Sequence, residues 1–211
     1  MKRYWLLVMV MALAGLTAAC GGQVATPTPE PQLQPTTAPA VEEPAAGSPE
    51  IDALKTEVVA NYADIVHAGY QDSYETALAL QAALQAFVAN PTAETQQAAK
   101  DAWLAAREPY GQTEVFRFYG GPIDDEDGPE GLINAWPLDE SYVDYVEGAP
   151  ESGIINNVAE YPEITPELLL SLNQTGAEEN VSIGYHAIEF LLWGQDLSAD
   201  GSGDRAFTDY T

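Results

Sequence analysis

The sequence predicts an all-α protein, an up-and-down helical bundle with one long irregular loop region. Three observations predict this fold. Apolar residues recur at three- and four-residue spacings from Ile51 to Tyr110, as they do on one face of a helix. A second strongly apolar helical stretch ends at Trp193. No stretch of useful length alternates between apolar and polar residues, as a half-buried strand would.

The helices of the first half follow from this spacing. Leu54, Val58 and Ile65 mark a first helical stretch, and the pattern continues from Ser73 to Val88. Asn90-Pro91 then predicts a boundary, with Asn90 as N-cap and Pro91 as the first helical residue. A third helix is expected from there to Tyr110.

The second half alternates between an irregular region and two further helices. Gly, Pro, Asp and Asn dominate residues 120–162, so we expect a long loop region, and loops of that length tend to be functional. Thr165-Pro166 predicts the start of a helix through Leu172. A last helix is expected from Glu178 to Trp193, with acidic residues in its first turn and Gly194 as its stop.

The N-terminus predicts export. Lys2 and Arg3 precede an apolar run that is shorter than the ~20 residues of a membrane-spanning helix, so residues 1–19 are expected to form a signal peptide. Thr17-Ala18-Ala19 before Cys20 resembles a bacterial lipobox, in which the cysteine is lipidated and becomes the mature N-terminus. The expected location is the cell envelope, with a lipid anchor in the membrane. The alternative is a plain signal peptide and an incidental thiol.

Composition divides the rest of the chain. Residues 20–50 are rich in Pro, Thr, Ala and Glu and are expected to form a solvated tether, whereas residues 51–211 suffice for one helical domain. The chain stops without a closing helix, which predicts a fragment of a longer domain. Its formal net charge is −26, which disfavours nucleic acid as a partner and favours cations.

His186 and Glu189 are the candidate site. Three residues apart on a helix, they lie on one face, where they can grip a single ion. Their apolar neighbours predict that both are buried, and a buried carboxylate needs a partner or a metal. The alternative is a neutral core histidine that is hydrogen-bonded to Glu189 or to backbone. The pair matches neither the H-E-x-x-H nor the H-x-x-E-H pattern of zinc peptidases.

Gly184-x-His186-x-x-Glu189 resembles the G-x-H-x-x-E signature of the imelysin family. Further similarities run in order along the chain. They comprise Trp103, Arg107, Tyr110, Thr113-Glu114-Val115-Phe116-Arg117-Phe118, Gly121-Pro122-Ile123-Asp124, Asn134-Ala135-Trp136-Pro137-Leu138-Asp139 and Gly176-Ala177-Glu178-Glu179-Asn180-Val181-Ser182. Gly203-Asp204-Arg205-Ala206-Phe207 departs from the Arg-Pro-Tyr of the family. The resemblance makes residues 51–211 the N-terminal portion of an imelysin-like domain.

The resemblance implies a helical cell-envelope protein linked to iron acquisition or described as a peptidase. We expect Glu114 as a further oxygen ligand and Arg117 as a partner of a carboxylate, with an ordinary surface ion pair as the alternative. No family motif falls on His67, which we interpret as a packing residue near Tyr62 and Tyr70.

Two functions follow. The first is binding of a divalent metal ion or an iron complex for uptake, with His186, Glu189 and Glu114 as ligands and other envelope uptake proteins as candidate partners. One nitrogen with hard oxygens accepts iron, manganese or zinc. The second is a metallopeptidase, in which the ion activates water; it needs a general base that the sequence does not identify. A scaffold that binds nothing is the third possibility.

Overall fold

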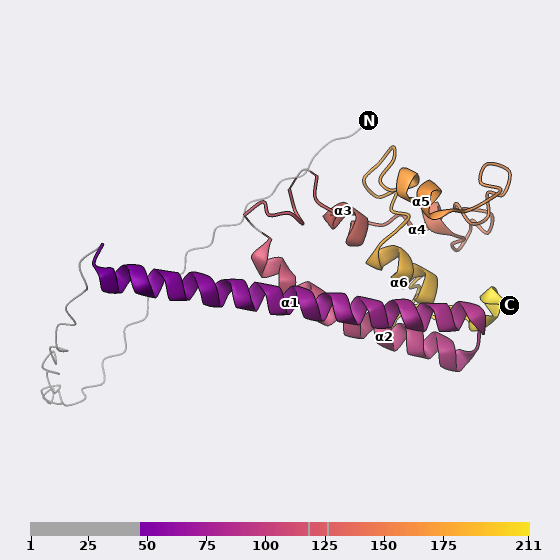
Figure 1. Ribbon diagram of the computed structural model, residues 1–211. Coiled ribbons are helices and arrows are strands. Elements are labelled where there is room, and N and C mark those ends of the chain that lie inside the picture. Colours follow the sequence, from indigo (N-terminus) through magenta and orange to yellow (C-terminus); the bar gives the residue numbers. More distant parts are fainter. Residues whose placement is uncertain (1–46, 118, 126) are drawn as a thin grey trace, which may run out of the picture. The chain divides into compact units, whose positions relative to one another are not determined.

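The computed structural model describes residues 47–117, 119–125 and 127–211. Over these residues the chain is all-α, which confirms the predicted fold class (Figure 1). The described part contains no named strand, only an isolated bridge between Val146 and Ala149. No helix in this part is both long enough and apolar enough to cross a bilayer.

Two long helices pack side by side in the described part. Helix α1 (Pro49–Ala89) merges the first two predicted helical stretches, and the Ser48 hydroxyl accepts from Ile51 N at its start. Helix α2 (Ala93–Gln112) returns alongside α1 after a short connection (Figure 1).

The predicted cap of α2 was wrong. Asn90 is the C-cap of α1, and Thr92 is the N-cap of α2. The Thr92 hydroxyl accepts from Thr95 N, and the Thr95 hydroxyl accepts from Thr92 N at 3.0 Å. These two reciprocal hydrogen bonds satisfy two backbone N–H groups that would otherwise lack a partner. Their stabilisation outweighs the local preference that would place Pro91 in the first helical position.

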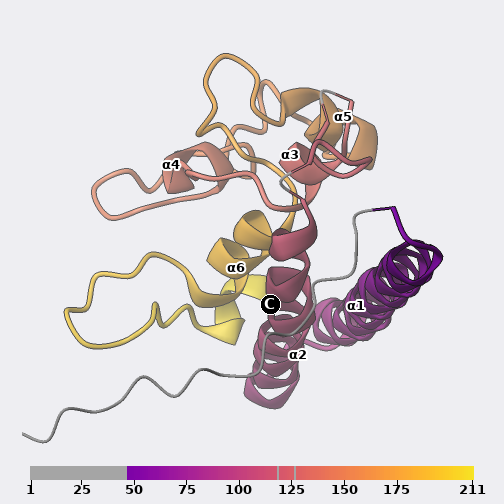
Figure 2. The same cartoon turned by 90° about the vertical axis from the view of Figure 1, so that its left-hand side faces the viewer.

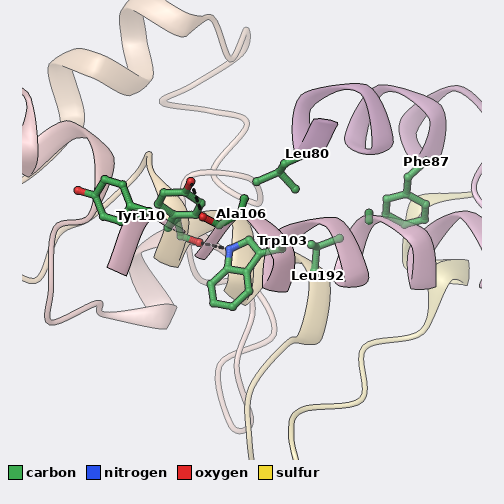
Figure 3. Packing of buried hydrophobic residues seen from close by; sticks show 8 residues of the cluster. Leu80, Phe87, Trp103, Ala106, Tyr110 and Leu192 are labelled. Carbon is green, nitrogen blue, oxygen red and sulfur yellow. Dashed lines mark hydrogen bonds between the residues drawn. The ribbon is translucent and has the colours of Figure 1, made fainter. Parts of the chain in front are cut away.

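Helix α2 packs against α1 on one side and against α6 (Tyr185–Trp193) on the other (Figure 2). Their buried side chains form one hydrophobic cluster, which includes Leu80 and Phe87 of α1 and Leu192 of α6 (Figure 3). Trp103 of α2 lies inside it and donates from its indole N–H to the Tyr185 carbonyl at 2.9 Å. This bond fixes the start of α6 against α2.

The loop region between α2 and α6 is irregular, as predicted, with short helical turns. These are η1 (Thr113–Phe116), α3 (Glu130–Ile133), α4 (Glu140–Val143) and α5 (Pro166–Leu172). Helix α5 starts where the sequence predicts, because the Thr165 hydroxyl accepts from Leu168 N and Pro166 occupies the first turn.

Helix α6 is shorter than predicted and starts at Tyr185, so Glu178 and Glu179 are not in its first turn. The preceding segment is held by α5 and its C-terminal flank instead. Ser182 N donates to Asn173 Oδ1, the Ser182 hydroxyl donates to Leu169 O, and Val181 is fully buried. These tertiary contacts override the local helical pattern. Gly194 ends the helix as predicted, with φ +71°.

The segment after α6 folds back onto the domain and ends in η2 (Phe207–Tyr210). Arg205 N donates to Trp193 O at 2.8 Å, and the Arg205 side chain is buried. The buried amide of Gln96 in α2 donates to both Leu192 O and Arg205 O. One side chain of α2 therefore satisfies carbonyls of two segments that follow about a hundred residues later in the sequence.

Candidate metal site on helix α6

Gly184 determines where α6 begins and therefore where His186 lies. Its φ of +88° is in the left-handed region, and a Cβ there would lie 2.6 Å from Ile133 O. Only glycine fits such a position without displacing the backbone. The close approach of α3 and the start of α6 places His186 in the first turn of the helix.

His186 and Glu189 interact directly across one helical turn. His186 Nδ1 lies 2.9 Å from Glu189 Oε2. The prediction that both are buried was wrong: the side chain of His186 is 15% exposed and that of Glu189 is 42% exposed. The buried positions of α6 are Tyr185, Ala187, Phe190 and Leu192, so the face with the His–Glu pair borders a pocket instead.

The separation of 2.9 Å is that of a hydrogen bond. Two ligand atoms bound to one tetrahedral metal ion, with bonds of ~2.0–2.1 Å, stand roughly 3.3 Å apart, so an ion held by both side chains would require them to move slightly apart. An imidazole nitrogen and a carboxylate oxygen are donors for zinc, iron or manganese. Without a metal, a proton on Nδ1 is shared with the carboxylate, which leaves Nε2 as the nitrogen with the free electron pair.

The pocket beside the pair has a volume of about 1080 Å³. Its wall combines α6 with the long loop region between α2 and α6, including Asn134, Trp136 and Glu140. Four carboxylate side chains line it, namely Asp139, Glu140, Glu189 and Asp196. Its described lining contains no Lys or Arg, so the electrostatic potential inside favours cations.

Glu114 and Arg117 lie at a different cavity, of about 370 Å³, which Asp124, Glu130 and Asn134 also line. Glu114 Oε1 is 3.2 Å from Arg117 Nη2, and the Glu114 side chain is 53% exposed. The buried guanidinium of Arg117 also pairs with Asp124 and Glu130. The structure thus joins His186 to Glu189 and Glu114 to Arg117, in two separate cavities.

In the part of the chain that the structure describes, no three His, Cys, Asp or Glu side chains are grouped closely enough to hold a metal. A bond from Glu114 to an ion on His186 and Glu189 would require its carboxylate to leave Arg117. Cys20 lies outside the described residues. His67 is exposed on α1 beside Tyr62 and Tyr70, so it is not a buried packing residue.

Two residues that sequence reasoning assigned no role are part of the site. The Trp136 ring lies against the His186 ring, with 4.7 Å between centroids. Asn134 lines both cavities: its Oδ1 accepts from Arg107 Nη1 at 2.6 Å, and its Nδ2 donates to Glu130 Oε1 at 3.2 Å. Both belong to residues 134–139, and the resemblance of this segment to the family was the one feature of the sequence that could have indicated their role.

The fold and the site together define a helical protein with a histidine–carboxylate pair in the lining of an acidic pocket that also contains tryptophan side chains. A family model described as Imelysin matches residues 66–211, and the chain belongs to this family. Iron-regulated protein A of Synechococcus elongatus is 45% identical over 60 residues, which are 28% of this chain and 16% of that protein. The matched stretch therefore spans well under two thirds of that relative.

Proposed function

We propose that this chain is a cell-envelope protein that binds a metal ion or an iron species through His186 and Glu189 and serves its uptake. The observation that carries the proposal is the 2.9 Å separation of His186 Nδ1 and Glu189 Oε2. At this separation a small outward movement of the two side chains would let both reach one ion, and both border an acidic pocket that is open to solvent. The name of the relative from Synechococcus elongatus, iron-regulated protein A, supports an iron-related role.

The imidazole and the carboxylate have different tasks in this proposal. His186 supplies a borderline nitrogen donor, and Glu189 supplies a hard, negatively charged oxygen that offsets the charge of the cation. The Trp136 ring, which lies against the imidazole at a tilt of 57°, would limit rotation of the imidazole and keep its donor atom directed at the ion. Glu114 remains a candidate further ligand that binds only after a rearrangement of its ion pair with Arg117.

The test is the metal content of purified protein after incubation with Fe²⁺, Mn²⁺ or Zn²⁺ and removal of the free ion. We expect His186→Ala and Glu189→Ala to weaken binding by about tenfold or more, because each removes a ligand. Glu163→Gln is the matched control, since Glu163 is exposed and does not line the pocket. Equal metal in all four proteins would refute the proposal, and Glu114→Gln measures whether the third carboxylate takes part.

The location in the envelope belongs to the same proposal. We propose that residues 1–19 are removed as a signal peptide, that Cys20 carries the lipid anchor, and that residues 20–50 tether the domain to the membrane. In a bacterial host, the wild-type chain should incorporate labelled palmitate and sediment with membranes. Cys20→Ser should incorporate none. An unlabelled wild-type chain that is released after cleavage would favour the plain signal peptide.

A further inference from the structure

The first part of α1 projects beyond the helix that packs on it. Helix α1 has 41 residues and α2 has 20, and α2 begins beside the end of α1, so α2 covers only the second half of α1 (Figure 1). The ring of Phe116 in η1 meets that of Tyr62, with 5.6 Å between centroids. Even so, residues 52–65 are all exposed. An isolated helix of ~12–15 residues is marginal in water, so this stretch would gain stability from a partner.

The exposed stretch continues the side of α1 that packs on α2. Leu80 and Phe87 are buried apolar residues of α1. Val58 precedes Leu80 by 22 residues, and Ile65 precedes Phe87 by the same interval. This interval is close to six turns at ~3.6 residues per turn, so all four residues lie on one side of the helix. Val58 and Ile65 are nevertheless 67% and 51% exposed, because α2 does not reach them.

This side has the spacing of a coiled-coil helix. Ile51, Val58 and Ile65 recur every seven residues, and Leu54 takes the second core position of the first heptad. These four residues form an apolar stripe. β-branched residues at the first core position and leucine at the second favour pairing with one other helix. Asn61 takes the second core position of the next heptad, and a polar residue in the core of such a pair sets its register.

One edge of the apolar stripe is acidic. Glu50, Glu57 and Asp64 also recur every seven residues, each directly before a β-branched residue of the stripe. These three residues form the acidic edge. In a coiled coil, residues at such edge positions select the partner through ion pairs between the helices. The neighbouring Lys55 pairs instead with Asp52, at 3.1 Å. The acidic edge therefore attracts a helix that carries Lys or Arg.

Charge disfavours a second copy and a membrane as the partner. The chain has a formal net charge of −26, so two copies repel each other. An antiparallel pair of copies would also place the two acidic edges side by side. Amphipathic helices that lie on membranes carry Lys and Arg beside their apolar face, whereas this one carries Glu and Asp. A basic helix of a different protein fits the surface best.

We propose that the first part of α1 docks an amphipathic helix of another protein, which places apolar heptad residues on the apolar stripe and Lys or Arg opposite the acidic edge. The interaction is independent of metal binding, because the stripe and the edge share no residue with the pocket beside His186. Docking gives the projecting part of α1 the helix partner that α2 provides for the rest.

The probes are designed peptides of about three heptads. A basic peptide has Ile and Leu at the core positions and Lys at the edge positions, and an acidic peptide has Glu in place of Lys. A third peptide has the composition of the basic one, with its apolar residues out of heptad order. Binding of each labelled peptide to the whole chain is measured by fluorescence anisotropy. We expect the basic heptad peptide to bind about tenfold more tightly than either other peptide.

Variants of exposed residues test the surface without disturbing the core. Val58→Asp should weaken binding of the basic peptide about tenfold, although it adds a negative charge, because it interrupts the apolar stripe. Ala60→Asp is the matched control, since it adds the same charge at an exposed position on the opposite side of α1. Glu57→Lys combined with Asp64→Lys should reverse the preference, so that the acidic peptide binds more tightly than the basic one.

Several outcomes would overturn the proposal. If the peptide without heptad order binds as tightly as the basic heptad peptide, the attraction is one of charge alone. Equal effects of Val58→Asp and Ala60→Asp would place the peptide elsewhere on the chain. A dimer in sedimentation that Val58→Asp dissociates would assign the stripe to a second copy. Binding to phosphatidylglycerol vesicles that Val58→Asp abolishes would assign it to a membrane.

Discussion

The buried ion pair of Arg205 and Asp144 holds the C-terminal segment against the loop region. Arg205 Nη1 lies 2.7 Å from Asp144 Oδ2, and both side chains are almost fully buried. Asp144 Oδ1 also accepts from Tyr145 N and from Asn156 Nδ2. Loss of the Asp144 charge would leave the buried guanidinium with only the longer contact from Nε to Asp209 Oδ2, at 3.8 Å.

Asp144→Asn should therefore lower the free energy of unfolding by ~3–5 kcal/mol. Urea titration followed by tryptophan fluorescence measures the change. Asp52→Asn is the matched control, because Asp52 pairs with Lys55 at the exposed surface of α1 and such pairs contribute little. Similar losses in the two variants would contradict the interpretation.

At the same scale, the sequence predicted the His186–Glu189 pair but not its surroundings. Helical spacing places residues three apart side by side, so the contact follows from the sequence alone. Trp136 comes from an irregular loop fifty residues earlier, where no periodicity indicates which way a side chain turns. The prediction that Glu189 is buried was wrong, because hydropathy shows how apolar a helix is and not which neighbours cover each of its faces.

The start of α6 is the element boundary on which the site depends. Gly184→Ala should cost more than ~2 kcal/mol of stability, because it adds a left-handed backbone penalty to a clash with Ile133 O. It should also weaken metal binding, since His186 follows two residues later. Thermal unfolding and metal titration measure the two effects.

Gly148 provides the matched control for Gly184. Its φ is +80°, but a Cβ there would meet nothing within 4 Å. Gly148→Ala should therefore cost about 1 kcal/mol, from backbone strain alone, and leave metal affinity unchanged. If the two alanine variants behave alike, the contact with α3 does not determine the position of α6.

Element boundaries were predictable where a local signal acts alone. Thr165-Pro166 and Gly194 delimit helices as expected, because an N-cap and a C-cap need only their own neighbours. The cap of α2 was missed because Asn90 and Thr92 compete, and the side chain of Thr95 decides between them. The segment before Tyr185 was missed because α5 and its flank hold it through contacts that no helical pattern contains.

Buried tyrosines make the stability of the whole domain sensitive to alkali. Burial raises the pKa of Tyr110, and the hydrogen bond to Glu130 raises it further. Burial likewise raises the pKa of Tyr185. The folded state therefore keeps these phenols protonated at a pH at which the unfolded chain loses its protons, near pH ~10.

A group whose pKa is higher in the folded than in the unfolded state contributes its full stabilisation at a pH below the pKa of the unfolded state. This contribution is lost as the pH rises toward the pKa of the folded state. The contribution of these tyrosines to the free energy of unfolding should thus be constant up to pH ~9 and fall above pH ~10. Urea titrations at a series of pH values measure this. Tyr185→Phe should make the decline shallower, whereas an unchanged slope would assign it to other groups.

Gln96 links distant parts of the chain into one cooperative unit. The two N–H groups of its amide donate to the last turn of α6 and to the returning segment, so loss of this side chain would leave both carbonyls without a partner. A substitution of Gln96 would therefore weaken the attachment of both α6 and the returning segment to α2. Because α6 and residues 194–203 both line the pocket, its lining would become more mobile as well.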